Sequence, residues 1–231
     1  MFEDNGWTEA ESEPQLLADG LIAAPHAAAS LDANGDDFCK VDRKLPKTTP
    51  WSGEAHALRL EDLLARFKTG RLSDAVMRSP DHVPRMTTKP DFGRVVEEQE
   101  NVVVEGWALA ASKESDNDFH VILGSEKTLA DDGSPDRWKL INIEVSGLSP
   151  VGTSGRQLLV DVRKTFKAYF VPTVADSQGR GFVALEPVHL RVTGSLFFDV
   201  DHLPGAVGPG KLKPMTSWEI HPITHLEILD E

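Results

Sequence analysis

The stretch Val102-Val103-Val104-Glu105-Gly106-Trp107-Ala108-Leu109 decides the fold class of this 231-residue chain. Its β-branched run is typical of a strand, and Gly106 lets a strand bend at the corner of a barrel. Four further strand-like segments follow it, at residues 118–123, 138–145, 188–200 and 218–229. Residues 156–170, between the third and fourth strands, carry an apolar stripe at helical spacing. The expected order is therefore strand, strand, strand, helix, strand, strand.

This order predicts a mainly β protein, a five-stranded OB-like barrel with one helix between strands 3 and 4. The barrel domain is expected to cover residues 91–231. Residues 58–90 are expected to form a short helical segment and a proline-rich connector, because apolar residues recur at helical spacing between Leu58 and Phe67. Residues 1–57 precede them as a long acidic arm of low hydrophobicity.

The formal net charge of −13 is concentrated in this arm. Residues 1–40 hold nine acidic residues against the single base Lys40, so they carry −8 and the rest of the chain carries −5. Such a composition does not fold alone, so we expect the arm to become ordered along a partner chain or along the barrel. Residues 137–170 carry +4, which predicts an electrostatic contact with the arm.

The sequence predicts a soluble protein without a membrane segment. The first residues lack the features of a signal peptide, and no apolar run approaches 18 residues, so we expect a cytoplasmic location. Cys39 is the single cysteine, which excludes an intrachain disulfide framework and a cysteine-rich metal site.

Three polar motifs fall on the predicted strands. They are Asp118-Phe119-His120-Val121, the FFDxxH stretch from Gly194 to His202, and Trp218-Glu219-Ile220-His221-Pro222. With these motifs the chain resembles a group of uncharacterised bacterial OB-like β-barrel proteins, over roughly residues 100–229. The resemblance implies the barrel and names no reaction.

The last two motifs supply a candidate metal site. Alternation along a strand places Glu219 and His221 on the face opposite to Trp218. Strands 4 and 5 of such a barrel are antiparallel neighbours, so polar residues at the end of one and the start of the other are expected to meet at a rim. These residues are Asp199, Asp201, His202, Glu219 and His221. Imidazoles and carboxylates suit Zn, Mn or Fe, and an open coordination position would allow hydrolysis. Alternatively, these groups only satisfy one another by hydrogen bonds.

Asp118 and His120 are expected to lie away from this rim, because strand 2 contacts strands 1 and 3 and begins at the opposite end. Asp118 would then cap the strand entry, and His120 would pair with a neighbouring backbone group or carboxylate. His120 and Trp138 are weaker ligand-binding candidates. Trp138 and Phe119 lie on strands that OB-folds often use to stack on nucleic-acid bases. The acidity of the whole chain opposes phosphate binding.

Three functions stay open from the sequence. The leading hypothesis is a non-enzymatic binding or assembly module without a cofactor, whose barrel and acidic arm contact a partner protein or a second copy of the chain. The first alternative is a metal-dependent hydrolase that uses a divalent metal at the rim cluster. The second alternative is a single-stranded nucleic-acid-binding OB module.

Overall fold

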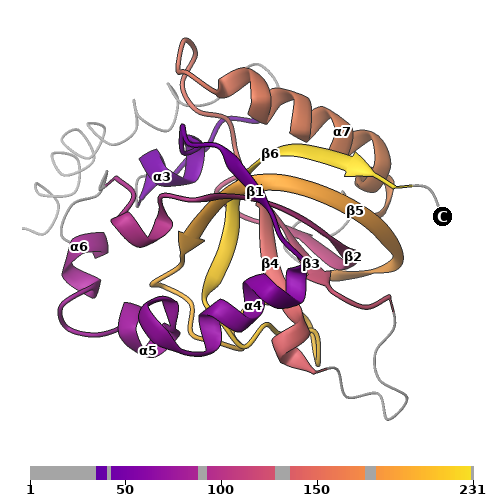
Figure 1. Ribbon diagram of the computed structural model, residues 1–231. Coiled ribbons are helices and arrows are strands. Elements are labelled where there is room, and N and C mark those ends of the chain that lie inside the picture. Colours follow the sequence, from indigo (N-terminus) through magenta and orange to yellow (C-terminus); the bar gives the residue numbers. More distant parts are fainter. Residues whose placement is uncertain (1–34, 41–42, 88–92, 128–135, 175–180, 230–231) are drawn as a thin grey trace, which may run out of the picture.

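The computed structural model describes residues 35–40, 43–87, 93–127, 136–174 and 181–229. Six strands form one mixed sheet in the order β1-β2-β3-β4-β6-β5, and β2 also pairs with β5 (Figure 1). The strands are β1 (Ala55–Ala57), β2 (Asn101–Lys113), β3 (Phe119–Gly124), β4 (Leu140–Val145), β5 (Val183–Phe198) and β6 (Trp218–Ile228).

The pairing of β2 with β5 closes the strands from β2 to β6 into a ring. Strands β4 and β6 are parallel, and the other neighbouring pairs of the ring are antiparallel. Along the chain the order is β2, β3, β4, α7, β5, β6, which is the order expected from the sequence. The prediction of a mainly β protein is therefore confirmed. The predicted third strand begins at Leu140, because Trp138 lies in the helical turn η3 (Arg137–Lys139).

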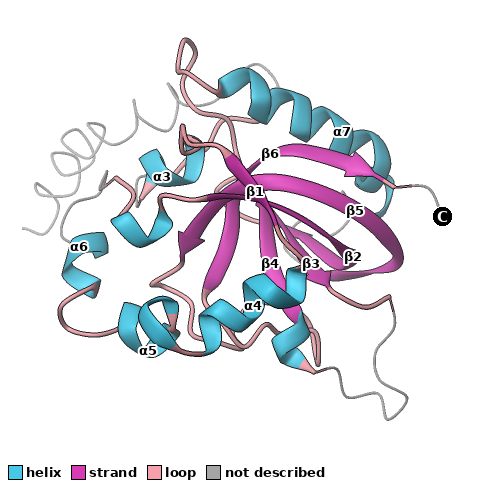
Figure 2. Ribbon diagram, viewed as in Figure 1, coloured by secondary structure: helices cyan, strands magenta, loops and turns pink. Residues whose placement is uncertain are grey.

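Two longer helices flank the strands. Helix α7 (Arg156–Val174) connects β4 to β5, and helix α4 (Leu60–Lys68) precedes the ring. In the view of Figures 1 and 2 they lie on opposite sides of the strands. Their apolar stripes are buried at Leu60, Leu63, Leu64 and Phe67 in α4 and at Leu159, Val162, Phe166 and Phe170 in α7. None of the helices in the described part of the chain has the length and apolar character needed to cross a bilayer.

The other described helices are short. They are α3 (Lys44–Thr48), α5 (Asp74–Met77) and α6 (Val83–Thr87), with the 3-10 turns η1 (Gly70–Leu72) and η2 (Val96–Glu98). Helix α6 lies in the segment that was expected to be a proline-rich connector. Pro84 lies in its first turn, where a missing backbone N–H costs no helical hydrogen bond.

One hydrophobic core joins the helical segment to the ring. The ring of Phe67 on α4 stacks on Trp218 of β6, with 5.1 Å between the ring centroids. Phe119, Ile143 and Ile220 belong to the same core, so the inner faces of β3, β4 and β6 point toward it. The polar residues between these side chains therefore lie on the outer face of the ring.

The end of the acidic arm lies along the ring as an N-terminal strap, residues 36–40 and 43–50. Phe38 is fully buried, and its N–H donates to the carbonyl oxygen of Leu148 at 2.9 Å. Gly147 packs directly on this segment, since a Cβ atom at Gly147 would lie 2.7 Å from Cα of Phe38. The strap is thus held by both hydrogen bonds and close packing.

Two acidic residues of the strap contact the predicted basic stretch. The carboxylate of Asp36 contacts Lys167 and lies 2.9 Å from Arg163, and Asp37 lies 2.9 Å from Arg156. These ion pairs confirm, for Asp36 and Asp37, the expected contact between the arm and residues 137–170. Residues 1–34 of the arm lie outside the described residues.

Candidate metal centre

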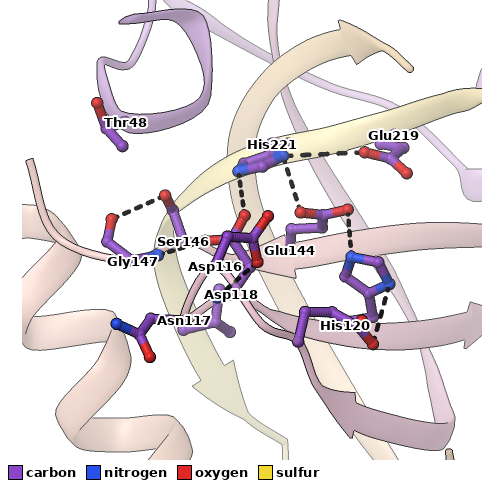
Figure 3. A network of polar contacts seen from close by, with 12 residues as sticks. Thr48, Asp116, Asn117, Asp118, His120, Glu144, Ser146, Gly147, Glu219 and His221 are labelled. Atoms are coloured by element: carbon purple, nitrogen blue, oxygen red, sulfur yellow. Dashed lines mark hydrogen bonds and ion pairs between the residues drawn. The ribbon is translucent and has the colours of Figure 1, made fainter. Parts of the chain in front are cut away.

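Three neighbouring strands place polar side chains on the outer face of the ring. They are Asp118 and His120 at the start of β3, Asn142 and Glu144 on β4, and Glu219 and His221 on β6. The strand registers bring these residues together, and Figure 3 labels all of them except Asn142. The antiparallel β3–β4 pair sets His120 opposite Glu144. The parallel β4–β6 pair sets Asn142 beside Glu219, so that Glu144 follows beside His221.

His221 lies between two carboxylates. Its Nδ1 is 2.9 Å from Oε2 of Glu144, and its Nε2 is 3.4 Å from Oδ2 of Asp118. Oε2 of Glu219 is 3.8 Å from Nδ1 of His221. On the other side of the cluster, Nε2 of His120 is 2.9 Å from Oε1 of Glu144. Asp118, Glu144 and His221 each offer one ligand atom, and these three atoms lie within 4.8 Å of one another.

Each carboxylate of this cluster has one oxygen that the protein fixes. The N–H of Gly147 donates to Oδ1 of Asp118 at 2.5 Å. Nδ2 of Asn142 donates to Oε1 of Glu144 at 3.0 Å and to Oε1 of Glu219 at 2.9 Å. The three carboxylates are thereby oriented before any ligand binds.

The second oxygen of each carboxylate lies beside the ring of His221. Within the described residues, Oε2 of Glu144, Oδ2 of Asp118 and Oε2 of Glu219 pair with the ring nitrogens of His221 at 2.9, 3.4 and 3.8 Å, but these contacts are not aligned as hydrogen bonds. Asp118 and His221 are completely buried. Buried carboxylates that gather around one imidazole bring several acceptor atoms to one point, and this arrangement favours a cation there.

Burial and neighbouring charges shift the pKa values of the cluster in different directions. Burial raises the pKa of Asp118 to about 7, although the neighbouring His221 opposes the shift. Burial and the charge of Glu144 raise the pKa of Glu219 well above its usual value. Burial alone would raise the pKa of Glu144, but the imidazoles of His120 and His221 hold it well below the usual range. Burial also opposes the charging of His120, yet Glu144 raises its pKa to about 10.

Two segments cover the outer face at this point. Val207 and Leu212, from the β5–β6 loop (residues 199–217), pack against apolar side chains of β2, β3 and β4. From the N-terminal strap, Lys47 extends its ammonium group over the ring of Phe197, at 5.7 Å. Burial would lower the pKa of Lys47, but Glu144 and Asp118 raise it above its usual value. A positive side chain therefore already neutralises part of the charge of the cluster.

The structure divides the residues predicted for the rim. Glu219 and His221 belong to the buried cluster, whereas Asp199 and His202 form a separate ion pair. The N–H of Asp201 donates to Oδ1 of Asp199 at 2.8 Å, and the side chain of Asp201 is exposed. Among the described residues, no group of three potential metal ligands includes Asp199, Asp201 or His202.

The expectation that Asp118 and His120 lie away from the site is wrong. Strand β4 lies between β3 and β6, and its Glu144 contacts both His120 and His221. Trp138 lies outside the cluster, in η3, with the ammonium of Lys68 5.3 Å from its ring.

Asn142 and Glu144 were missed by the sequence argument. The alternation in Leu140-Ile141-Asn142-Ile143-Glu144-Val145 could have identified them, since two polar residues share one face of an otherwise apolar strand. Two carboxylates and one imidazole from three strands suit Zn, Mn or Fe. Comparison of the chain with protein-family models, with curated proteins and with solved structures found no match.

Proposed function

We propose that this protein is a metal-dependent hydrolase built on an OB-like barrel, with Asp118, Glu144 and His221 as the metal ligands. The ring order β2-β3-β4-β6-β5 and the position of α7 between the third and fourth strands of the ring support the OB-like barrel. The closing pair β2–β5 supports it further, because it leaves no free edge between these two strands.

The observation that carries the metal centre is the state of the carboxylate oxygens. Gly147 and Asn142 fix one oxygen of each carboxylate, and the other oxygen lies 2.9–3.8 Å from a ring nitrogen of His221. Metal ligands are commonly oriented by such additional hydrogen bonds from the protein. A divalent ion would replace these ion pairs and would be bound by Oδ2 of Asp118, Oε2 of Glu144 and one ring nitrogen of His221.

The donor set favours one class of metal. An imidazole nitrogen with two carboxylate oxygens suits Zn²⁺, Mn²⁺ or Fe²⁺, whereas Ca²⁺ and Mg²⁺ prefer oxygen ligands alone. The imidazole must be neutral and the carboxylates ionised to bind the metal, so binding is expected to release protons.

Hydrolysis is favoured over a purely structural metal by the number of protein ligands, which is three. Three protein ligands leave a coordination position for water in a catalytic zinc site. A cavity with room for about one water molecule lies beneath the β5–β6 loop and is lined by Asn142 and Glu219. Asn142 separates this cavity from Glu144, to which it donates a hydrogen bond.

The two other functions predicted from the sequence are less well supported. OB domains bind oligonucleotides on the face of strands 2 and 3, which corresponds here to β3 and β4. Val207 and Leu212 of the β5–β6 loop cover part of that face, which argues against a nucleic-acid module. The assembly module stays a prediction, because the structure describes only part of the arm. The described part includes the strap, residues 36–40 and 43–50.

Metal titration of the full-length chain tests the proposed function. After removal of metal with a chelator, calorimetry with Zn²⁺ and with Mn²⁺ should give one tight site per chain. Glu144→Gln and His221→Gln should abolish this site. Glu227→Gln changes an exposed carboxylate on the same strand as His221 and should keep it. Absence of binding by the wild-type chain would reject the proposal.

A further inference from the structure

One arginine joins the N-terminal strap to the strand that carries His221. Nη2 of Arg94 donates to the carbonyl oxygen of Pro46 in the strap at 2.5 Å and to that of His221 at 2.8 Å. Nη1 of the same side chain donates to the carbonyl oxygen of Leu196 on β5. The backbone of α3 and the backbone of a proposed metal ligand are therefore bound by one guanidinium.

A buried ion pair fixes the residue that precedes α3. Nη1 and Nη2 of Arg43 donate to the carboxylate of Glu98 at 2.8 and 2.6 Å, and both side chains are buried. Nη1 of Arg43 also donates to the carbonyl oxygen of Phe198 on β5, at 3.0 Å. Together with Arg94, this pair holds α3 against β5 and β6, so a side chain on α3 has a defined position relative to the metal centre.

Lys47 of α3 and His221 of the metal centre contact the same phenyl ring. The ammonium of Lys47 lies 5.7 Å from the centroid of Phe197 and 5.9 Å from that of Phe38. The ring of Phe197 packs on the imidazole of His221, with 5.3 Å between the centroids. The strap thus places a positive charge beside the proposed ligands, with two aromatic rings against it.

Four carboxylates act on this ammonium. Burial would lower the pKa of Lys47, but these carboxylates raise it above its usual value. They belong to Glu144, Asp118, Asp199 and Glu219. In return, Lys47 is one of the groups that oppose the rise in pKa that burial imposes on Asp118. The ammonium and the carboxylates therefore stabilise each other in their charged forms.

A bound metal ion would compete with this ammonium. A divalent ion held by Asp118, Glu144 and His221 would take up the negative charge that now acts on Lys47. It would also repel the ammonium, and such repulsion is strong where water is excluded. Coupling between two binding events is reciprocal, so a strap that weakens metal binding must itself be weakened by the metal.

We propose that Lys47 is the internal counter-ion of the empty metal centre, and that metal binding displaces its ammonium and loosens the strap around α3. This inference rests on the proposed function and concerns the regulation of its metal centre. It links the occupancy of a buried site to a segment at the surface, where Leu45 of α3 is 48% exposed. The strap is closed while the centre is empty and opens when the metal binds.

Calorimetry with Zn²⁺ on the full-length chain tests the competition. Lys47→Met should bind Zn²⁺ about 10-fold more tightly than the wild type, within the 5- to 150-fold range typical of coupling between sites. Lys47→Arg keeps the charge and should keep the wild-type Kd. Lys44→Met removes the other lysine of the same helix and is the matched control, with an unchanged Kd.

Thermal unfolding separates a counter-ion from a residue that only packs. Without metal, Lys47→Met should have a lower Tm than the wild type, because its carboxylates lose a positive partner. Zn²⁺ should then raise the Tm of Lys47→Met by more than it raises that of the wild type. A side chain that only packs would lower Tm equally with and without Zn²⁺, and that result would overturn the inference.

Proteolysis of the wild-type chain tests the strap without any substitution. Chymotrypsin should cut after Leu45 faster in the presence of Zn²⁺ than after treatment with a chelator. In Lys47→Met the effect of Zn²⁺ on this cut should be much smaller. Protection of Leu45 by Zn²⁺, or an unchanged rate in the wild type, would overturn the release of the strap.

The outcomes distinguish this inference from the proposed function. An equal Kd for Zn²⁺ in the wild type, Lys47→Met and Lys44→Met would overturn the role of Lys47 and leave the metal centre intact. Failure of the wild type to bind Zn²⁺ would reject the proposed function, and this inference with it.

Discussion

Nδ1 of His221 lies 2.9 Å from Oε2 of Glu144, and both side chains are buried on the outer face of the ring. This contact joins two strands, β4 and β6, that are parallel neighbours in the ring. Glu144 also contacts His120 on the opposite side, so a single carboxylate lies between two imidazoles. The contacts of Glu144 make it the central residue of the cluster.

Loss of this carboxylate should destabilise the metal-free protein. Glu144→Gln removes the carboxylate nearest to two buried imidazoles, and removal of one member of a buried ion pair typically costs about 3–5 kcal/mol. We expect a decrease of this size in the free energy of unfolding, measured with urea at neutral pH. Glu227→Gln affects only an exposed pair and should cost less than about 1 kcal/mol. A cost for Glu144→Gln as small as that of the control would contradict the central role of Glu144.

Metal should stabilise the folded chain. A ligand that binds only the native state adds about 2.7 kcal/mol when its free concentration is about 100-fold above Kd. Zn²⁺ should therefore raise Tm of the wild-type chain in a concentration-dependent manner. His221→Gln lacks the only imidazole among the three proposed ligands, so its Tm should not respond. An equal response in both proteins would place the metal elsewhere.

The packing of the N-terminal strap depends on Gly147. A methyl group there would lie 2.7 Å from Cα of Phe38, so Gly147→Ala must displace the strap or the strand end. Overpacking of this kind typically costs about 1–3 kcal/mol. Limited proteolysis should then cut the strap faster than in the wild type. Gly93→Ala is the matched control, since no atom lies within 4 Å of a Cβ at Gly93. If protease cuts the strap of Gly147→Ala no faster than that of the wild type, the contact between Gly147 and Phe38 does not determine how firmly the strap is packed.

The ion pair between Arg66 and Glu100 should give a small pH dependence of stability. The hydrogen bonds from Arg66 hold the pKa of Glu100 below its usual value of 4.5, and burial opposes the shift. The pair therefore stabilises the protein above the unfolded-state pKa, and this contribution is lost as the pH falls through the lowered folded-state pKa. Both groups are partly exposed, so the effect should not exceed about 1 kcal/mol. Glu100→Gln should be less stable than the wild type at pH 7, and the difference should disappear once the pH falls below the lowered pKa of Glu100. A difference that persists below that pH would have another cause.

Local patterns made most of the strands predictable. The β-branched and alternating segments predicted a strand over residues 118–123, and β3 spans Phe119–Gly124. Strand β1 and helix α3 were missed, because they are short and lie in a segment whose composition resembles an unfolded chain. Strand β1 exists through its parallel pairing with β2, which is a tertiary contact that local composition does not encode.

The candidate site was predictable only in part. Alternation correctly placed Glu219 and His221 opposite the apolar side chains of β6. The partners of these residues depend on the parallel register of β4 and β6, which joins segments far apart in the sequence. Two-residue spacing identifies which side chains share a face, but it does not identify which strands are neighbours. For that reason Asp118 was set aside and Glu144 was overlooked.

Anomalous diffraction from crystals grown with Zn²⁺ tests the central claim most directly. The account predicts one anomalous peak at about 2.0–2.2 Å from an oxygen of Asp118, an oxygen of Glu144 and a ring nitrogen of His221. Asn142 and Gly147 should still bond the other carboxylate oxygens. A fully occupied peak elsewhere, or no peak with His221 paired directly to the two carboxylates, would contradict the metal centre.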